Sequence, residues 1–363
     1  MYIFILSVFS IFFLLVGCTP STQKSENSSF SLSAMNLIKE VGIRETEDIR
    51  IARVRLANFT HDTIFILDSP SGNLKLYSHS GNPYAVLFQR GVSPKELSQP
   101  IAIAITDNSL VIPDAAVSAI KIFNKKGENT NYVFLEDVKA FTSDGNIFYL
   151  SDSLFLSSFS FKYGFAQTPV ITVSDKTGKT LARLGKYPDD YYAFSKDSYP
   201  MLESRYFDIR NNYLIAITFV SSPAIQFVSM DNKIQKMFPF QEKRERYISK
   251  ERLSKPNASF EEMLKISFIE MYNYAIFFVN DSTVIRAFNQ KTEESYQKRS
   301  FVLRKNFLEA YSTSGDFLGE LPLPGYLHAV RGDTLLIEES DEPDNRRFGL
   351  YHLVWTKNNV ANQ

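Results

Sequence analysis

The sequence predicts an all-β fold made of six copies of one four-stranded antiparallel unit. Three observations lead to this class. Phe, Trp and Tyr make up 14% of the 363 residues, and such flat side chains pack well in β-sheets. A strand-like pattern that ends in a turn residue recurs six times along the chain. A second strand pattern precedes every copy of the first.

The recurring pattern has apolar residues at its second and fourth positions and a Gly or Asn at its ninth. The alternation points the apolar side chains to one face of a strand, and the ninth residue tolerates the positive φ of a tight hairpin turn. The copies end at Gly81, Gly127, Gly178, Asn232, Gly315 and Asn358. Four of the five spacings are 43 to 54 residues, and the spacing of 83 indicates one large insertion.

Each copy belongs to a group of four short apolar segments. The preceding strand patterns begin at Asp62, Asn108, Asn146, Asn212, Asp281 and Asp333. The segments predicted to be innermost include residues 54–59, 101–105, 138–142 and 326–330. The fourth segments are residues 84–88, 132–135, 180–184, 236–240 and 317–323. Four antiparallel strands repeated six times predict a six-bladed β-propeller.

The last unit lacks its fourth strand, because only five residues follow Asn358. An N-terminal segment is therefore expected to supply it, and the candidates are residues 36–41 and 48–52. Joining the chain ends in this way removes the exposed sheet edges that promote aggregation.

The stretch from Asp62 to Ile105 resembles the NHL-type six-bladed propellers, which are common in secreted and lipid-anchored bacterial proteins. The resemblance rests on Asp62, Asp68, Asn73, Leu74, Tyr77, Gly81, Gly91, Pro94, Glu96, Leu97 and Pro100. The first two repeats match well, whereas the later ones lose the Gly-Pro-Glu-Leu connector. The resemblance implies the fold but no single function, because such propellers host binding, scaffolding and several enzymes.

The N-terminus has the features of an export signal. Residues 1–17 are uncharged and apolar, too short for a membrane span and suited to a signal peptide. The run Leu15 to Cys18 resembles the bacterial lipobox, which implies cleavage before Cys18 and a diacylglycerol on its thiol. No Lys or Arg precedes the apolar run, so an uncleaved N-terminal anchor is the alternative.

This organisation predicts a protein attached to a membrane. Residues 18–36 are polar and rich in Ser, which predicts a flexible tether, and residues 37–363 form the propeller. The expected location is the cell envelope, where the chain is lipid-anchored on the outer-membrane, periplasmic or surface side.

Charge and composition exclude several function classes. Forty Lys and Arg balance forty Asp and Glu, which argues against nucleic-acid binding. A single cysteine, Cys18, excludes an intrachain disulfide and a Cys-rich zinc site. The sequence has no nucleotide-binding or hydrolase motif, and no cofactor is expected. The histidines occupy non-equivalent positions in the repeat and predict no metal site: His61, His79, His328 and His352.

Two insertions exceed the repeat. Residues 185–200 carry the candidate ligand-binding side chains, in which tyrosines could stack on a sugar or peptide and carboxylates could accept hydrogen bonds: Tyr187, Asp189, Asp190, Tyr191, Tyr192 and Tyr199. The alternative is a long connection whose aromatic residues cover the core. The second insertion, residues 241–273, contains Ser259 and Glu262 as a capping box, which predicts a helix at 259–269.

Two sets of carboxylates are interpreted as structural. The first lies between two strands of the last unit and predicts a solvated hairpin tip rather than a calcium site: Glu338, Glu339, Asp341, Glu342 and Asp344. The second recurs near the ends of the second strands, where a carboxylate can accept backbone N–H bonds: Asp68, Asp114 and Asp152.

The sequence favours a non-catalytic binding or scaffold propeller whose ligand is a protein, peptide or glycan. The central funnel or the two insertions would form the binding surface. The alternative is a propeller enzyme, such as a metal-dependent lactonase or a lyase, with its site at the central channel. The segments predicted to be innermost are largely apolar, which favours binding over catalysis.

Overall fold

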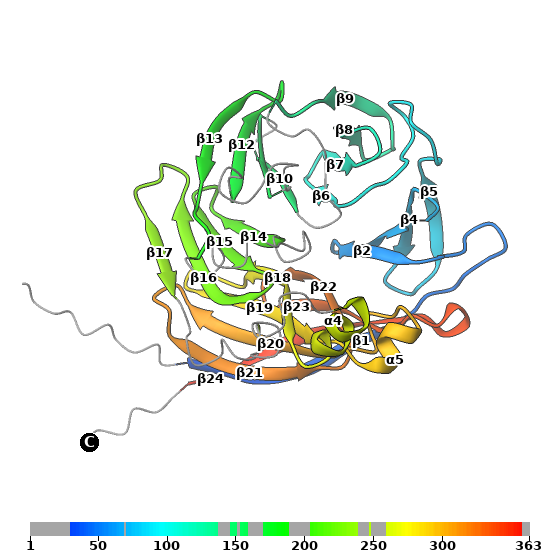
Figure 1. The fold of residues 1–363 in the computed structure, drawn as a ribbon. Coiled ribbons are helices and arrows are strands. Elements are labelled where there is room, and N and C mark those ends of the chain that lie inside the picture. Colours follow the sequence, from blue (N-terminus) through cyan, green and yellow to red (C-terminus); the bar gives the residue numbers. More distant parts are fainter. Residues whose placement is uncertain are drawn as a thin grey trace, which may run out of the picture.

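The protein folds into six four-stranded antiparallel sheets arranged as the blades of a ring (Figure 1). It is seen in a computed structural model that describes residues 30–68, 70–136, 146–150, 153–158, 170–188, 204–238, 247 and 259–357. The predicted six-bladed β-propeller is confirmed. In the described part of the chain, no helix is long and apolar enough to cross a membrane.

The strands of each blade follow one another from the centre of the ring outwards (Figure 1). Blade 1 contains β2 (Val54–Phe59), β3 (Thr63–Asp68), β4 (Asn73–Ser78) and β5 (Pro83–Leu87). Blade 2 contains β6 (Ala104–Ile105), β7 (Ser109–Asp114), β8 (Ala119–Asn124) and β9 (Asn129–Val133). Blade 3 contains β10 (Ile147–Leu150), β11 (Leu154–Ser157), β12 (Ile171–Asp175) and β13 (Thr180–Leu184).

The remaining blades repeat this order. Blade 4 contains β14 (Arg205–Arg210), β15 (Leu214–Phe219), β16 (Ser222–Ser229) and β17 (Gln235–Phe238). Blade 5 contains β18 (Met271–Phe278), β19 (Thr283–Gln290), β20 (Lys305–Ser312) and β21 (Phe317–Leu323). Blade 6 contains β22 (Tyr326–Arg331), β23 (Thr334–Ser340), β24 (Arg347–Lys357) and β1 (Phe30–Gly42).

The middle strands are buried on both faces, because each blade packs between two neighbours. Every residue of β3 is buried, and every residue of β16 as well. The outermost strand β5 instead alternates between exposed and half-buried positions. The apolar runs in the sequence therefore mark the middle strands, and the weaker alternating patterns mark the outer ones.

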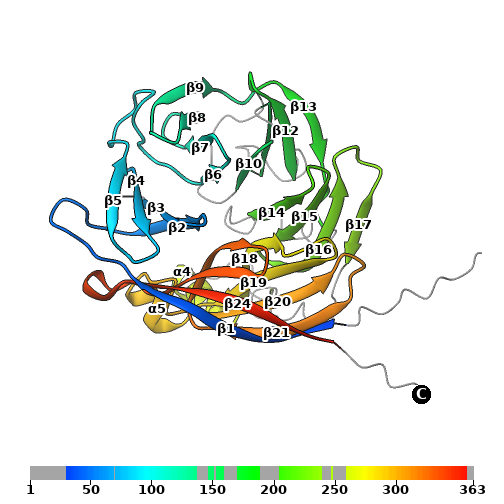
Figure 2. The same cartoon turned by 180° about the vertical axis from the view of Figure 1, so that it is seen from behind.

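The N-terminal strand closes the ring. β1 pairs antiparallel with β24 through eleven residue pairs, and Figure 2 shows the two strands side by side. This confirms that residues 36–41 supply the missing strand, whereas residues 48–52 connect β1 to β2. The strand starts at Phe30, so residues 30–36 belong to it and not to the predicted tether, because Leu32 and Met35 pack in the core between blades 5 and 6.

Blade 3 differs from the sequence prediction in its first two strands. The sequence places residues 146–150 second, but β10 is the edge strand of the sheet and β11 is second. The Ser153 N–H donates to the Leu150 carbonyl at 3.0 Å between the two strands, and the sequence prediction contains no strand at residues 154–157. The predicted innermost segment 138–142 lies outside the described residues, as does Asp152.

The helix predicted at 259–269 is confirmed. α4 (Phe260–Ser267) lies between β17 and β18, and the Ser259 and Glu262 side chains form its capping box. A second short helix that the sequence analysis does not predict, α5 (Glu293–Gln297), lies between β19 and β20. Both helices lie over the same face of the ring in Figure 1.

The predicted turn residues have positive φ wherever they are described. Gly81, Gly127, Gly178, Asn232 and Gly315 adopt φ between 59° and 97°, and Asn358 lies outside the described residues. Gly81 has a second role, because its carbonyl accepts the Arg44 N–H at 2.9 Å. A Cβ on Gly81 would overlap the carbonyl oxygen of Gly42, so the turn fixes the chain that leads from β1 into blade 1.

We predict that Gly81→Ala lowers the free energy of unfolding by about 2–4 kcal/mol, because left-handed strain adds to the overlap with Gly42. Gly332→Ala is the matched control, since Gly332 has a φ of 54° with nothing within 4 Å of an added Cβ. It should lose only about 1 kcal/mol. Urea denaturation measures the free energy of unfolding of both variants. Equal losses would show that the close approach of Gly81 to the Gly42 carbonyl does not affect stability.

Candidate functional site

The innermost strands all start at one face of the ring. Each blade repeats the same strand order, so its innermost strand starts at the same face as those of the other blades. The connection that carries α4 ends at the start of β18, and the α5 connection leaves the end of β19, next to that start. We call this face the α4/α5 rim, and it faces the viewer in Figure 1.

Two buried carboxylates hold the chain as it enters blades 1 and 2. Asp68, at the end of β3, accepts the N–H groups of Ala52 and Arg53 at 3.1 Å each and pairs with Lys75. In blade 2, Asp114 accepts the N–H groups of Ser98 and Gln99 at 3.0 and 2.9 Å and pairs with Lys121 at 2.9 Å. Both carboxylates thus have the predicted structural role.

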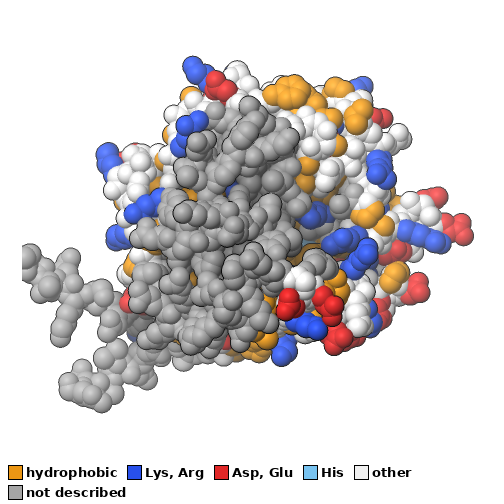
Figure 3. All heavy atoms as spheres, in the orientation of Figure 1, with side chains coloured by type: hydrophobic (Ala, Val, Ile, Leu, Met, Phe, Trp, Pro, Cys, Tyr) orange, Lys and Arg blue, Asp and Glu red, His pale blue; other side chains and the backbone are white. Residues whose placement is uncertain are grey.

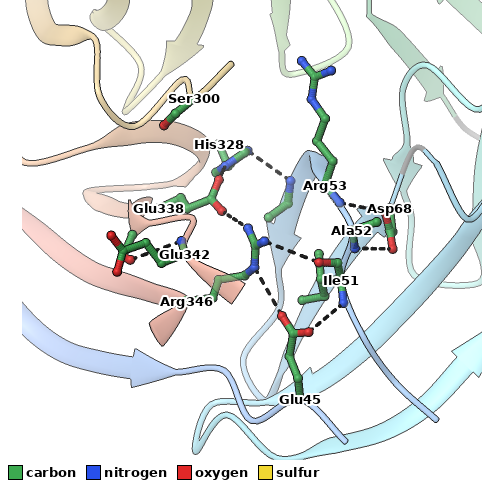
Figure 4. A network of polar contacts seen from close by, with 12 residues as sticks. Glu45, Ile51, Ala52, Arg53, Asp68, Ser300, His328, Glu338, Glu342 and Arg346 are labelled. Atoms are coloured by element: carbon green, nitrogen blue, oxygen red, sulfur yellow. Dashed lines mark hydrogen bonds and ion pairs between the residues drawn. The ribbon is translucent and has the colours of Figure 1, made fainter. Parts of the chain in front are cut away.

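A buried polar network joins blade 6 to blade 1 at the same rim (Figure 4). His328, on β22, accepts the Ala57 N–H at its Nδ1, 3.2 Å away, so its Nε2 carries the proton and lies 2.9 Å from Glu338 Oε2. The other oxygen of Glu338 accepts from Arg346 at 2.6 Å. Arg346 in turn lies 3.6 Å from Glu45 Oε1.

Glu338 and Glu339 lie on β23 and not at the predicted acidic hairpin tip, and the half-buried Glu339 accepts from the Tyr351 hydroxyl. The Glu338 side chain is buried in this network, whereas Glu342 and Asp344 are exposed as predicted. The burial follows from its position on β23, where it pairs in register with Phe348 of β24. Arg346, two residues after Asp344, lies against Glu338 and compensates its charge.

The network leaves little capacity for acid–base chemistry. A general base needs a free lone pair, but both imidazole nitrogens of His328 are engaged by Ala57 and Glu338. Within the described ranges, no group of three or more His, Cys, Asp or Glu side chains is placed to hold a metal ion. The hydrogen bond from the Ala57 N–H to His328 joins blade 1 to blade 6, and Glu338 holds the imidazole from within blade 6.

The same network positions the backbone of residues 51–53. The Ile51 N–H donates to Glu45 at 3.1 Å, and its carbonyl accepts from Arg346 at 3.5 Å. Asp68 holds the next two N–H groups. With its backbone fixed, Arg53 directs its exposed side chain away from the network, as Figure 4 shows.

A cluster of aromatic and cationic side chains lies beside Arg53, and we call it the mouth cluster. Its members come from the innermost strands or the residue before them, from the end of β19 and from the α5 connection: Arg53, Tyr274, Asn289, Phe301, Arg304 and Tyr326. The rings of Tyr274 and Tyr326 stack 4.4 Å apart, and Phe301 lies 5.2 Å from Tyr326. The mouth cluster therefore spans blades 1, 5 and 6.

Two guanidinium groups flank the Phe301 ring. The Arg304 guanidinium carbon lies 4.4 Å from the ring centroid, and that of Arg53 lies 5.4 Å from it. Both distances are within the range of cation–π attraction. Arg304 is also held by Asn289, whose Oδ1 accepts from Arg304 Nη1 at 3.1 Å. The sequence analysis missed this cluster, because residues 291–304 belong to no repeated segment.

The ligand-binding residues predicted from the sequence are only partly described. Tyr187 is 2% exposed and packs in the core with Phe219, with the ring centroids 5.7 Å apart, so it presents no surface for stacking. Asp189, Asp190, Tyr191, Tyr192 and Tyr199 lie outside the described residues, and their role stays a prediction. Tyr187 itself agrees with the alternative of an aromatic residue that covers the core.

Comparison with known proteins supports the fold alone. No protein-family model and no curated protein matches the chain. Solved structures do. A member of the DUF4221 family from Bacteroides vulgatus is 10% identical, with a TM-score of 0.62 over 91% of this chain and 99% of its own. A "putative exported protein" from Bacteroides fragilis is 11% identical, with a TM-score of 0.57 over 92% and 98%.

Virginiamycin B lyase from Staphylococcus aureus is also similar, at 11% identity and a TM-score of 0.50 over 90% of this chain and 100% of its own. Identities this low show a shared propeller and carry no activity from one protein to another.

We predict that Glu338→Ala lowers the free energy of unfolding by about 3–5 kcal/mol, because it leaves the buried Arg346 without its carboxylate. Glu342→Ala is the matched control from the exposed tip, and its effect should stay within about 0.5 kcal/mol. Chemical denaturation of both variants is the measurement. A fully stable Glu338→Ala protein would show that the network does not hold blades 6 and 1 together.

Proposed function

We propose that this protein is a non-catalytic binding propeller of the bacterial cell envelope, anchored by a lipid on Cys18, with its ligand bound at the mouth cluster. The observation that carries the binding role is the pair of guanidinium groups around Phe301 at the rim where the innermost strands begin. Among the described residues, neither Arg53 nor Arg304 has a carboxylate partner. Guanidinium groups without a carboxylate partner are suited to bind an acceptor on a ligand.

The hydrogen bonds of His328 and Glu338 support binding over catalysis. Each nitrogen of His328 and each oxygen of Glu338 already has a protein partner. The pair therefore has no position from which to exchange a proton with a bound molecule.

The envelope location is supported by the N-terminal sequence. An uncharged apolar segment precedes Cys18 in the run Leu15 to Cys18, which resembles a lipobox. A protein of the same fold carries the description "exported". The described ring starts at Phe30, which leaves eleven residues after Cys18 to separate it from a membrane surface.

We expect the chain to incorporate labelled palmitate when it is expressed in a bacterial host, and Cys18→Ser to abolish the label because the acceptor thiol is gone. Thr19→Ser is the matched control and should be labelled like the parent chain. Gel autoradiography of the immunoprecipitated protein measures the label. An unlabelled parent chain, found in membranes with residues 1–17 intact by mass spectrometry, would instead support the uncleaved anchor.

A further inference from the structure

The mouth cluster contains two buried hydrogen-bond donors without acceptors. Arg304 Nε and Asn289 Nδ2 are both shielded from solvent, and neither has a hydrogen-bond partner among the residues that the structure describes. Asn289 is 1% exposed, and its Oδ1 is already used by Arg304 Nη1. Buried donors of this kind are costly when they stay unpaired, so the site is built to receive an oxygen acceptor.

The charge of Arg304 points to the same conclusion. Four fully buried cations have a carboxylate partner: Lys75 with Asp68, Lys121 with Asp114, Arg286 with Glu309, and Arg346 with Glu338. A fifth, Arg205, donates to the Val170 carbonyl. Arg304 has none among the described residues, and burial lowers its pKa because the charged form loses hydration. An anion beside Arg304 would compensate this charge as the carboxylates do elsewhere.

Arg53 supplies a second positive charge on the solvent side of the same ring. Its side chain is exposed, and its backbone is held by Asp68. In Figure 3, several Lys and Arg side chains are visible near β2, with Asp and Glu side chains next to them toward α4. A negatively charged molecule would therefore meet Arg53 first and then reach Arg304 and Asn289.

We propose that the mouth cluster binds the carboxylate or phosphate group of a small organic anion, with Arg304 and Asn289 as the inner donors and Arg53 as the outer cation. This inference rests on the proposed binding function and names the chemical class of its ligand. The rings of Phe301 and Tyr326, both half-buried, contact the apolar part of the ligand.

The test is isothermal titration calorimetry on the full chain in detergent, with benzoate and inorganic phosphate as probes. Benzamide is the neutral counterpart of benzoate. We expect binding of benzoate or phosphate at millimolar concentrations or below and none of benzamide. The probe that binds identifies the preferred oxyanion. If neither anion binds to the folded protein, the proposal is wrong.

Asn289→Asp is the decisive variant, because it places a carboxylate beside Arg304 in the position of the missing partner. The substitution should raise the melting temperature and weaken anion binding by about tenfold or more. A stabilised protein that keeps its full affinity would overturn the assignment. The variant removes no buried side chain, since it adds a carboxylate like those beside Lys75, Lys121, Arg286 and Arg346.

Arg53→Gln tests the outer cation on a surface where folding is not at risk, and it should weaken binding several-fold. Arg50→Gln is its matched control, because Arg50 is exposed three residues earlier. If both variants bind the anion with equal affinity, Arg53 is not part of the binding site. Loss of anion binding leaves lipid labelling at Cys18 unaffected, so failure of this site and failure of the envelope anchor are distinguishable.

Discussion

The antiparallel pairing of β1 with β24 is the constraint on which the rest of the structure depends. Without β1, blade 6 would have three strands, and the exposed edge of β24 would offer unpaired backbone groups to another chain. The pairing also buries Leu32 between blades 5 and 6 and carries the chain into the Gly81 turn of blade 1. One strand therefore connects the last two blades to the first.

The contact between blades 6 and 1 depends on this closure, and it determines where Arg53 lies. The chain that leaves β1 is held at Ile51 by Glu45 and Arg346, and at Ala52 and Arg53 by Asp68. A structural network thus fixes the backbone from which the exposed Arg53 side chain reaches the Phe301 ring. The paired buried charges provide rigidity, whereas we propose that Arg53 and Arg304, which lack a carboxylate partner in the described part of the chain, bind the ligand.

Much of the fold could be predicted from the sequence, because hairpin turns require residues such as Gly81 and the last unit visibly lacks a strand. The start of β1 at Phe30 could not be predicted, because residues 30–36 bury only Leu32 fully and therefore resemble a polar tether. The mouth cluster could not be found, since Phe301 and Arg304 belong to no repeat and meet Arg53 only in the closed ring. The burial of Glu338 could not be predicted, because its neighbours in the sequence are also acidic and its pairing with β24 is seen only in the structure.

Denaturation of two N-terminal truncations tests ring closure most directly. Removal of residues 1–29 leaves β1 intact, so unfolding should stay a single cooperative transition with the midpoint of the full chain. Removal of residues 1–42 deletes β1, and we expect a much lower midpoint together with self-association through the edge of β24. A monomer that lacks residues 1–42 and unfolds at the same midpoint as the shorter truncation would contradict the account.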